Sequence, residues 1–241
     1  MNIEVFAAHT HMTDKDVRGK ACVVIDTLRA TSTMATALSN GCDQIIAVEE
    51  VQQAIEMKVS MNEHVVLLGG ERNAVKMAGF DFGNSPLEYT QEAVFGKTVV
   101  MTTTNGTQAI NKAKNANILY MGAMINASRV AQSLLDQPDD VVILCAGTHG
   151  KFSTDDCMTA GYIIFKMMEF NGDDPLTLDD LAQVCLDLYT RNQDDPKAEV
   201  SKCYHYNKLV EAGFTEDLTY CFTMDSVPVL PKYEDGRITL A

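Results

Sequence analysis

The 241-residue sequence has no tryptophan, no C-x-x-C pair and no apolar run near the ~20 residues that a membrane helix needs. Basic residues are scarce, since 19 Lys and Arg stand against 33 Asp and Glu, a formal net charge of −14. That charge argues against nucleic acid or an anionic membrane as a partner. The first ten residues have neither a basic start nor a long apolar stretch, so we expect no export signal.

Metal-binding and redox signatures are equally scarce. The seven cysteines are widely spread and odd in number, which argues against a disulfide scaffold or a zinc ribbon. The five histidines include no H-E-x-x-H pattern, and the phosphate-binding motif G-x-x-x-x-G-K-[ST] is missing. We therefore expect a cytoplasmic protein whose chemistry does not depend on zinc or on a Walker loop.

Short β-branched runs recur along the chain and end in small or polar clusters. The strongest predicted strands are 23–25, 65–68, 99–101 and 141–144, with weaker ones at 3–6, 44–48 and 117–120. Predicted helices lie between and after them, at 31–40, 49–62, 106–113, 127–135, 157–170, 177–191 and 202–212, and the stretch 225–241 is expected to be extended.

This alternation predicts an α/β fold with three layers, α/β/α, around a mostly parallel or mixed central sheet. The pattern becomes helix-rich from about residue 155. Because the sequence shows no clear linker or internal repeat, one domain over residues 1–241 is the simpler prediction.

Polar clusters follow the four strongest predicted strands, and in open α/β sheets ligands bind beyond the carboxyl ends of strands. The first cluster contains Asp26, Arg29, Thr31 and Ser32. It offers a carboxylate, a guanidinium and free amides at a helix start, a combination suited to an anion. The alternative is ordinary helix capping by Thr31 or Ser32, with Arg29 as a surface cation.

The second cluster joins Glu71 and Arg72, after two glycines, to the loop that contains Asp81, Asn84 and Ser85. Glycines let the backbone approach a ligand closely, and the charged groups need partners or solvent. A Gly-rich turn with a Glu–Arg ion pair, followed by a surface loop, is the alternative.

Two further clusters complete the predicted rim. Residues 102–107 contain Thr103, Thr104, Asn105 and Gly106 at a strand-to-helix junction, which suits a phosphate cradle or simply a capped turn. Gly147 is followed by Asp155 and Asp156. These carboxylates could hold Mg²⁺ or simply favour a helix start.

Together these clusters resemble the 2-phosphosulfolactate phosphatase family. The resemblance rests on residues 24–33, 70–72, 79–86, 102–107 and 145–147, in the family's order, and covers roughly residues 15–230. It implies Mg²⁺-dependent hydrolysis of a small anionic phosphate ester, (2R)-O-phospho-3-sulfolactate, to 3-sulfolactate and phosphate, a step toward coenzyme M in methanogens.

The resemblance and the clusters together assign candidate roles. The expected catalytic residues are Asp26, Arg29, Glu71 and Arg72, and the expected Mg²⁺ ligands are Asp26, Glu71, Asp81 and Asp156. The expected substrate-binding residues are Thr31, Ser32, Asn84, Ser85, Thr103, Thr104, Asn105, Gly106 and Gly147. Asp26 either attacks phosphorus or holds the metal that activates water.

The sequence leaves other functions open. A haloacid-dehalogenase-like phosphatase would want a second Asp two residues after Asp26, where this chain has Leu28. A phosphatase of another 2-phospho-carboxylic acid, or a non-catalytic protein that binds a phosphorylated or sulfonated acid, would share the anion cradle. A homo-oligomer is expected on general grounds.

Overall fold

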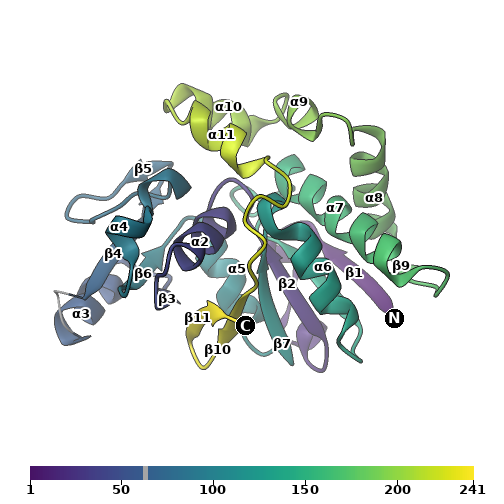
Figure 1. Cartoon of the computed structure of the whole chain (residues 1–241), viewed down its shortest axis with the longest axis horizontal. Helices are drawn as coiled ribbons and strands as arrows, with labels where there is room; N and C mark the ends of the chain where they lie inside the picture. The colour runs from purple at the N-terminus through teal and green to yellow at the C-terminus, as the bar shows by residue number, and fades with distance from the viewer. Residues whose placement is uncertain (62–64) are drawn as a thin grey trace.

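The computed structural model describes residues 1–61 and 65–241 as a mixed α/β structure (Figure 1). Its strands are β1 (Asn2–Phe6), β2 (Ala21–Ile25), β3 (Gln44–Ala47), β4 (Val66–Arg72), β5 (Val75–Lys76), β6 (Thr98–Thr102), β7 (Ile118–Gly122), β8 (Val141–Cys145), β9 (Thr177–Leu178), β10 (Pro231–Glu234) and β11 (Arg237–Leu240). Its helices are α1 (Asp14–Val17), α2 (Ala30–Ser39), α3 (Val51–Met61), α4 (Gln91–Val94), α5 (Gly106–Ala113), α6 (Ala127–Leu135), α7 (Thr154–Asn171), α8 (Asp180–Arg191), α9 (Pro196–Val200), α10 (Tyr204–Glu211) and α11 (Thr215–Cys221).

All these strands join one sheet, in the order β5-β4-β6-β3-β11-β10-β7-β2-β8-β1-β9. Two groups are internally parallel, β4-β6-β3 and β7-β2-β8-β1-β9. The antiparallel hairpin β10–β11 lies between them and pairs with β7 on one side and β3 on the other. The sheet is therefore mixed, as predicted.

Helices cover both faces of the sheet, which makes three layers. Alternate residues of β2 divide between two cores: Val23 and Ile25 pack with α6 and α7, while Cys22 and Val24 pack with α2 and α5. Every residue of β2, β6 and β8 is buried. In the sequence these strands are continuous β-branched runs, because a strand covered on both faces has no side that faces solvent.

The two parallel groups lean toward each other, and their carboxyl ends converge beneath α10 and α11 (Figure 1). The polar clusters that follow β2, β4, β6 and β8 consequently meet, which confirms the prediction that they share one rim. Within the described residues, no helix combines the length and apolarity needed to cross a membrane.

Most predicted elements are present with small shifts at their ends. The predicted helix over 49–62 corresponds to α3, although Asn62, its last residue, and His64 lie outside the described residues. The strand predicted at 65–68 instead runs to Arg72, because Gly69 and Gly70 pair in parallel with β6.

The C-terminal third differs more from the predictions. The helix predicted at 177–191 starts later: Thr177 pairs with β1, and α8 begins at Asp180 with Asp179 accepting the Ala182 N–H. Pro196 starts the short helix α9, in the interval between the helices predicted at 177–191 and 202–212. The extended tail folds back on itself through Asp235 and Gly236, both at positive φ, to form the hairpin β10–β11.

Candidate active site

A cavity of about 170 Å³ opens where the carboxyl ends of β2, β4, β6 and β8 meet. Its walls come from the loops after these strands and from α10, which lies across the rim (Figure 1). Acidic, basic and amide side chains face it, namely Asp26, Arg29, Glu71, Asn73, Asn84, Asn105, His149, His205 and Lys208. Segments distant in sequence thus form one polar site.

Asp26 follows β2 directly and is 7% exposed. Its Oδ1 accepts a long hydrogen bond, 3.3 Å, from the N–H of Ala30 at the start of α2. Burial raises the pKa of Asp26 to about 6, although the positive charge of His205 opposes the shift. Gly106 is required beside it, because a Cβ there would lie 2.7 Å from Asp26 Oδ2. The start of α5 can therefore approach this carboxylate closely.

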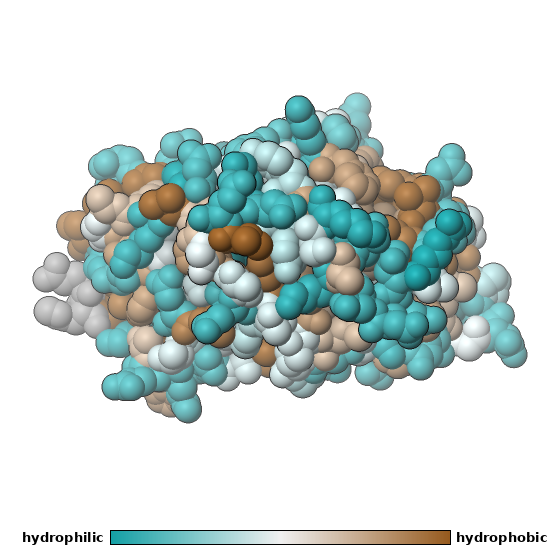
Figure 2. Space-filling view, turned by 90° about the horizontal axis from the view of Figure 1, so that it is seen from above, coloured by the Kyte–Doolittle hydropathy of each residue, from teal (hydrophilic) through white to brown (hydrophobic). Residues whose placement is uncertain are grey.

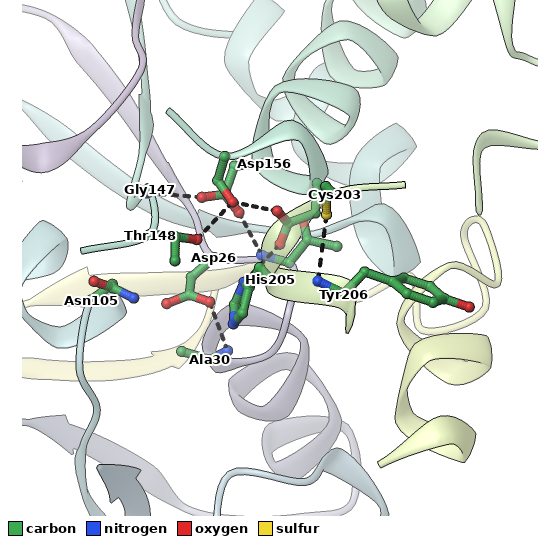
Figure 3. A network of polar contacts seen from close by, with 12 residues as sticks. Asp26, Ala30, Asn105, Gly147, Thr148, Asp156, Cys203, His205 and Tyr206 are labelled. Atoms are coloured by element: carbon green, nitrogen blue, oxygen red, sulfur yellow. Dashed lines mark hydrogen bonds and ion pairs between the residues drawn. The ribbon is translucent and has the colours of Figure 1, made fainter. Parts of the chain in front are cut away.

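His205, in the first turn of α10, stands next to Asp26 (Figure 3). Its Nδ1 donates to Oδ2 of Asp155 at 3.3 Å. Burial alone would lower the pKa of His205, but the hydrogen bond and charge of Asp155 outweigh it, so the pKa is raised. Conversely, His205 overcomes burial and lowers the pKa of Asp155. With Nδ1 held by Asp155, Nε2 is left for the cavity.

Asp156 lies beneath this pair and is 2% exposed. Its two oxygens accept backbone hydrogens from Thr27, at 3.0 Å, and from Gly147, at 2.9 Å (Figure 3). Burial, together with the negative charges of Asp155 and Asp26, raises the pKa of Asp156 well above its ordinary value. Asp156 thus fastens the loop after β2 to the loop after β8.

Glu71, near the end of β4, organises the opposite wall. Its Oε1 accepts the N–H of Thr104 at 2.8 Å, and its Oε2 accepts the N–H of Ala74 at 2.7 Å and the Thr104 hydroxyl at 3.1 Å. The carboxylate therefore holds the loops after β4 and β6 together while lining the cavity.

Arg29 lines the cavity although its side chain is 2% exposed. Its Nη1 donates to Oδ2 of Asp217 at 2.6 Å, and the guanidinium lies 3.9 Å from the centre of the Phe214 ring. The other Asp217 oxygen accepts the Ser85 hydroxyl at 2.7 Å. Asp217, on α11, thereby connects Arg29 to the loop before α4.

Asn84 also lines the cavity, and it is 5% exposed. Its backbone carbonyl accepts the Thr33 hydroxyl at 2.9 Å, which holds this part of the loop against α2. Its side-chain Oδ1 is buried and has no hydrogen-bond partner among the described residues. Buried polar atoms are normally paired, so the Asn84 carboxamide is well placed to contact a ligand or water.

Several predicted site residues do not line the cavity. Arg72 follows Glu71 in an extended strand, so the two side chains point to opposite faces. Its guanidinium donates to the Glu49 carbonyl and the Thr102 hydroxyl. Asp81 accepts from Lys58 and from the Leu68 N–H, away from the other predicted ligands.

Most of the remaining predicted residues do not line the cavity but hold the groups that do. Thr31 accepts the Asp26 N–H, Ser32 donates to the Thr27 carbonyl, and Ser85 donates to Asp217. Thr103 exchanges hydrogen bonds with Thr107, which caps α5 locally. Gly147 acts through its N–H on Asp156. Thr104 and Asn105 do line the cavity, and Asn105 Oδ1 accepts the His149 N–H at 3.2 Å.

Asn73, His149 and Lys208 line the cavity but were not predicted as site residues. Two further residues that were not predicted, His205 and Asp217, form ion pairs with buried residues of the site. Neither belongs to a strand-end cluster, and both come from the C-terminal helices. For Asp217 a weak signal exists, because Glu216 and Asp217 follow Gly213 and Thr215 as acids follow a helix start. That signal predicts α11 but not its contact with Arg29.

The donor set fits the Mg²⁺ that the resemblance implies. No group of three His, Cys, Asp or Glu side chains spaced for a metal occurs within residues 1–61 and 65–241. Mg²⁺, however, is commonly held by one or two carboxylates together with waters and substrate phosphate oxygens. Asp26 and Glu71 present two carboxylates to one cavity.

Comparison with known proteins places this chain in a family. A family profile described as 2-phosphosulpholactate phosphatase matches residues 7–236. Among the curated relatives, a probable 2-phosphosulfolactate phosphatase of Caldanaerobacter subterraneus subsp. tengcongensis is 42% identical over 99% of this chain and 98% of its own. The same description belongs to a Clostridium novyi protein, 43% identical over 99% of this chain and 100% of its own. The match spans all four polar clusters and the C-terminal helices that complete the cavity, and the chain belongs to the 2-phosphosulfolactate phosphatase family.

Proposed function

We propose that this protein is a Mg²⁺-dependent phosphatase that hydrolyses 2-phosphosulfolactate to 3-sulfolactate and phosphate. Family membership supports the phosphatase activity and the substrate. Release of 3-sulfolactate would serve a pathway of the coenzyme M type.

The charge balance of the cavity is the observation that carries the metal requirement. Arg29, His205 and Lys208 are already ion-paired, with Asp217, Asp155 and Glu211 respectively. Asp26 and Glu71 add two further carboxylates. A phosphate ester that also carries carboxylate and sulfonate groups would be repelled there unless a divalent cation offset the carboxylates.

Asp26 and Glu71 would hold that cation, which supplies charge neutralisation and Lewis acidity at a phosphoryl oxygen. Arg29 binds the phosphoryl group: Asp217 engages one side of its guanidinium, and the planar group carries five N–H donors in total. The Asn84 carboxamide contacts the same ligand from the neighbouring wall. Because Asp217, Ser85 and Thr33 hold both groups in place, little ordering is needed when substrate binds.

His205 is placed to donate a hydrogen bond from Nε2 to the leaving oxygen. Asp155 orients the ring, and the raised pKa of His205 favours the form that carries both N–H groups. Stabilisation of the leaving oxygen by a positioned donor contributes to breaking its bond to phosphorus.

The test is phosphate release from phosphosulfolactate, phospholactate and phosphoglycolate by the purified protein, with Mg²⁺ and then with EDTA. We expect fast release that EDTA abolishes. Turnover that persists in EDTA would refute the metal requirement. Absence of release from all three esters would refute the phosphatase and favour a non-catalytic anion-binding protein.

A further inference from the structure

A second cavity, of about 340 Å³, adjoins the first and shares four lining residues with it: Thr148, His149, Tyr204 and His205. Its remaining walls come from residues 151–154, which lead into α7, and from Cys203. The face that carries α10, seen from above in Figure 2, is mostly hydrophilic, with scattered apolar side chains.

The two cavities differ in charge. Asp26 and Glu71 face the first cavity, whereas no carboxylate is among the residues that line the second. Lys151 and His149 line the second cavity, and Lys151 forms no ion pair with any residue that the structure describes. An anionic group is therefore favoured in the second cavity without help from a metal ion.

Backbone contacts hold the turn that carries His149 and Lys151. Thr148 and Lys151 exchange N–H to carbonyl hydrogen bonds of 2.9 and 3.1 Å. His149 adopts φ 52°, and its N–H is held by Asn105, on the wall of the first cavity. The main chain of this turn is thus tied to the wall of the first cavity.

His205 determines which part of a substrate lies here, because it lines both cavities and stands next to Asp26. In the proposed reaction the phosphoryl group lies at Asp26 and Arg29, and the leaving oxygen lies at His205. The rest of the leaving group then extends past His205 into the second cavity.

We propose that the second cavity is the subsite for the sulfonate of the leaving group, with Lys151 as its main cation and His149 as a neighbouring donor. This inference rests on the proposed phosphatase function. It makes the enzyme selective for 2-phospho acids that carry an anionic group on the carbon next to the ester-bearing one.

The test compares kcat/KM for phosphosulfolactate and phospholactate, which lacks the sulfonate, in the wild type and in Lys151→Met. We expect the wild type to prefer the sulfonated ester and Lys151→Met to lower that preference by about tenfold, as expected for one charge-assisted hydrogen bond. His149→Asn is a second test variant. Asn is chosen for this position because it tolerates positive φ better than most residues. Lys114→Met, at the end of α5 remote from Asp26, is the matched control and should leave the preference unchanged.

Binding of the product provides a readout independent of turnover. Calorimetry should show that 3-sulfolactate binds more weakly to Lys151→Met than to the wild type. Equal wild-type use of both esters, or an equal loss for both in Lys151→Met, would overturn the subsite while leaving the phosphatase intact. A wild type that releases no phosphate from either ester would refute the proposed function itself.

Discussion

Arg29 and Asp217 form an ion pair of 2.6 Å with side chains that are 2% and 3% exposed, although they lie 188 residues apart in the chain. Arg29 immediately precedes α2 and Asp217 lies on α11, so this contact ties the C-terminal helices to the first polar cluster. Two charges buried this deeply have lost most of their hydration, and each depends on the other for compensation.

Replacing Asp217 with Asn should therefore destabilise the protein by about 3–5 kcal/mol, because it leaves the Arg29 charge buried without its counter-ion. We expect the double variant Arg29→Met/Asp217→Leu to lose less stability than the sum of the losses in the single variants Arg29→Met and Asp217→Leu, which with the wild type complete the cycle. Urea unfolding of all four proteins measures the coupling. Strict additivity would show that the two charges do not depend on each other.

Replacing Asp26 with Asn should abolish turnover yet stabilise the metal-free protein. In EDTA, the wild-type carboxyl has a pKa of about 6 when folded and about 3.8 when unfolded. Between these values the folded state retains a proton that the unfolded state has released, so wild-type stability falls as the pH rises through this window.

The Asp26→Asn variant does not show this fall in stability with pH. Its stability advantage over the wild type should appear above pH ~4 and reach roughly 3 kcal/mol above pH ~6, since one pKa unit corresponds to about 1.4 kcal/mol. Urea unfolding at a series of pH values checks this expectation. An advantage of the same size at every pH would contradict it.

Mg²⁺ should raise the melting temperature of the wild type but not that of Asp26→Asn, because a ligand that binds the folded state stabilises it. Asp81→Asn is the matched acidic control. Its carboxylate is engaged by Lys58 and the Leu68 N–H, so we expect it to respond to Mg²⁺ like the wild type. Loss of the Mg²⁺ response in Asp81→Asn would restore Asp81 as a metal ligand.

Asp155 and His205 should behave as one unit in catalysis. His205→Gln removes the donor at the leaving oxygen, and Asp155→Asn leaves the ring without its orienting charge. We expect each to lower kcat by roughly 100-fold. Combining them should cost little more than either alone, because the second change acts on an interaction already lost. A multiplicative loss in the double variant would show that they act separately.

The rim of the site can be predicted from the sequence because it depends on local patterns. A buried β-branched run that ends at Asp26, followed by a helix start, places the carboxylate beyond a strand end whatever the rest of the chain does. The position of Arg72 away from the cavity also has a local reason. Once β4 is known to continue through it, strand alternation turns it away from Glu71.

His205 and Asp217 could not be located in this way. Each reaches the site through the packing of a C-terminal helix over the rim, and no local pattern encodes which residue that packing brings opposite Asp26 or Arg29. The stretch 225–241 is predicted to be extended, but the place of the hairpin β10–β11 inside the sheet depends on the free edges of β3 and β7.

That hairpin also constrains the order of assembly. Residues 231–240 are synthesised after every strand they join, so β3 and β7 keep unpaired edges while the nascent chain grows. Each parallel group can form earlier, but the sheet is continuous from one group to the other only once the hairpin pairs with β3 and β7. The interval before closure is the stage at which the chain is most exposed to edge-to-edge association and to capture by chaperones.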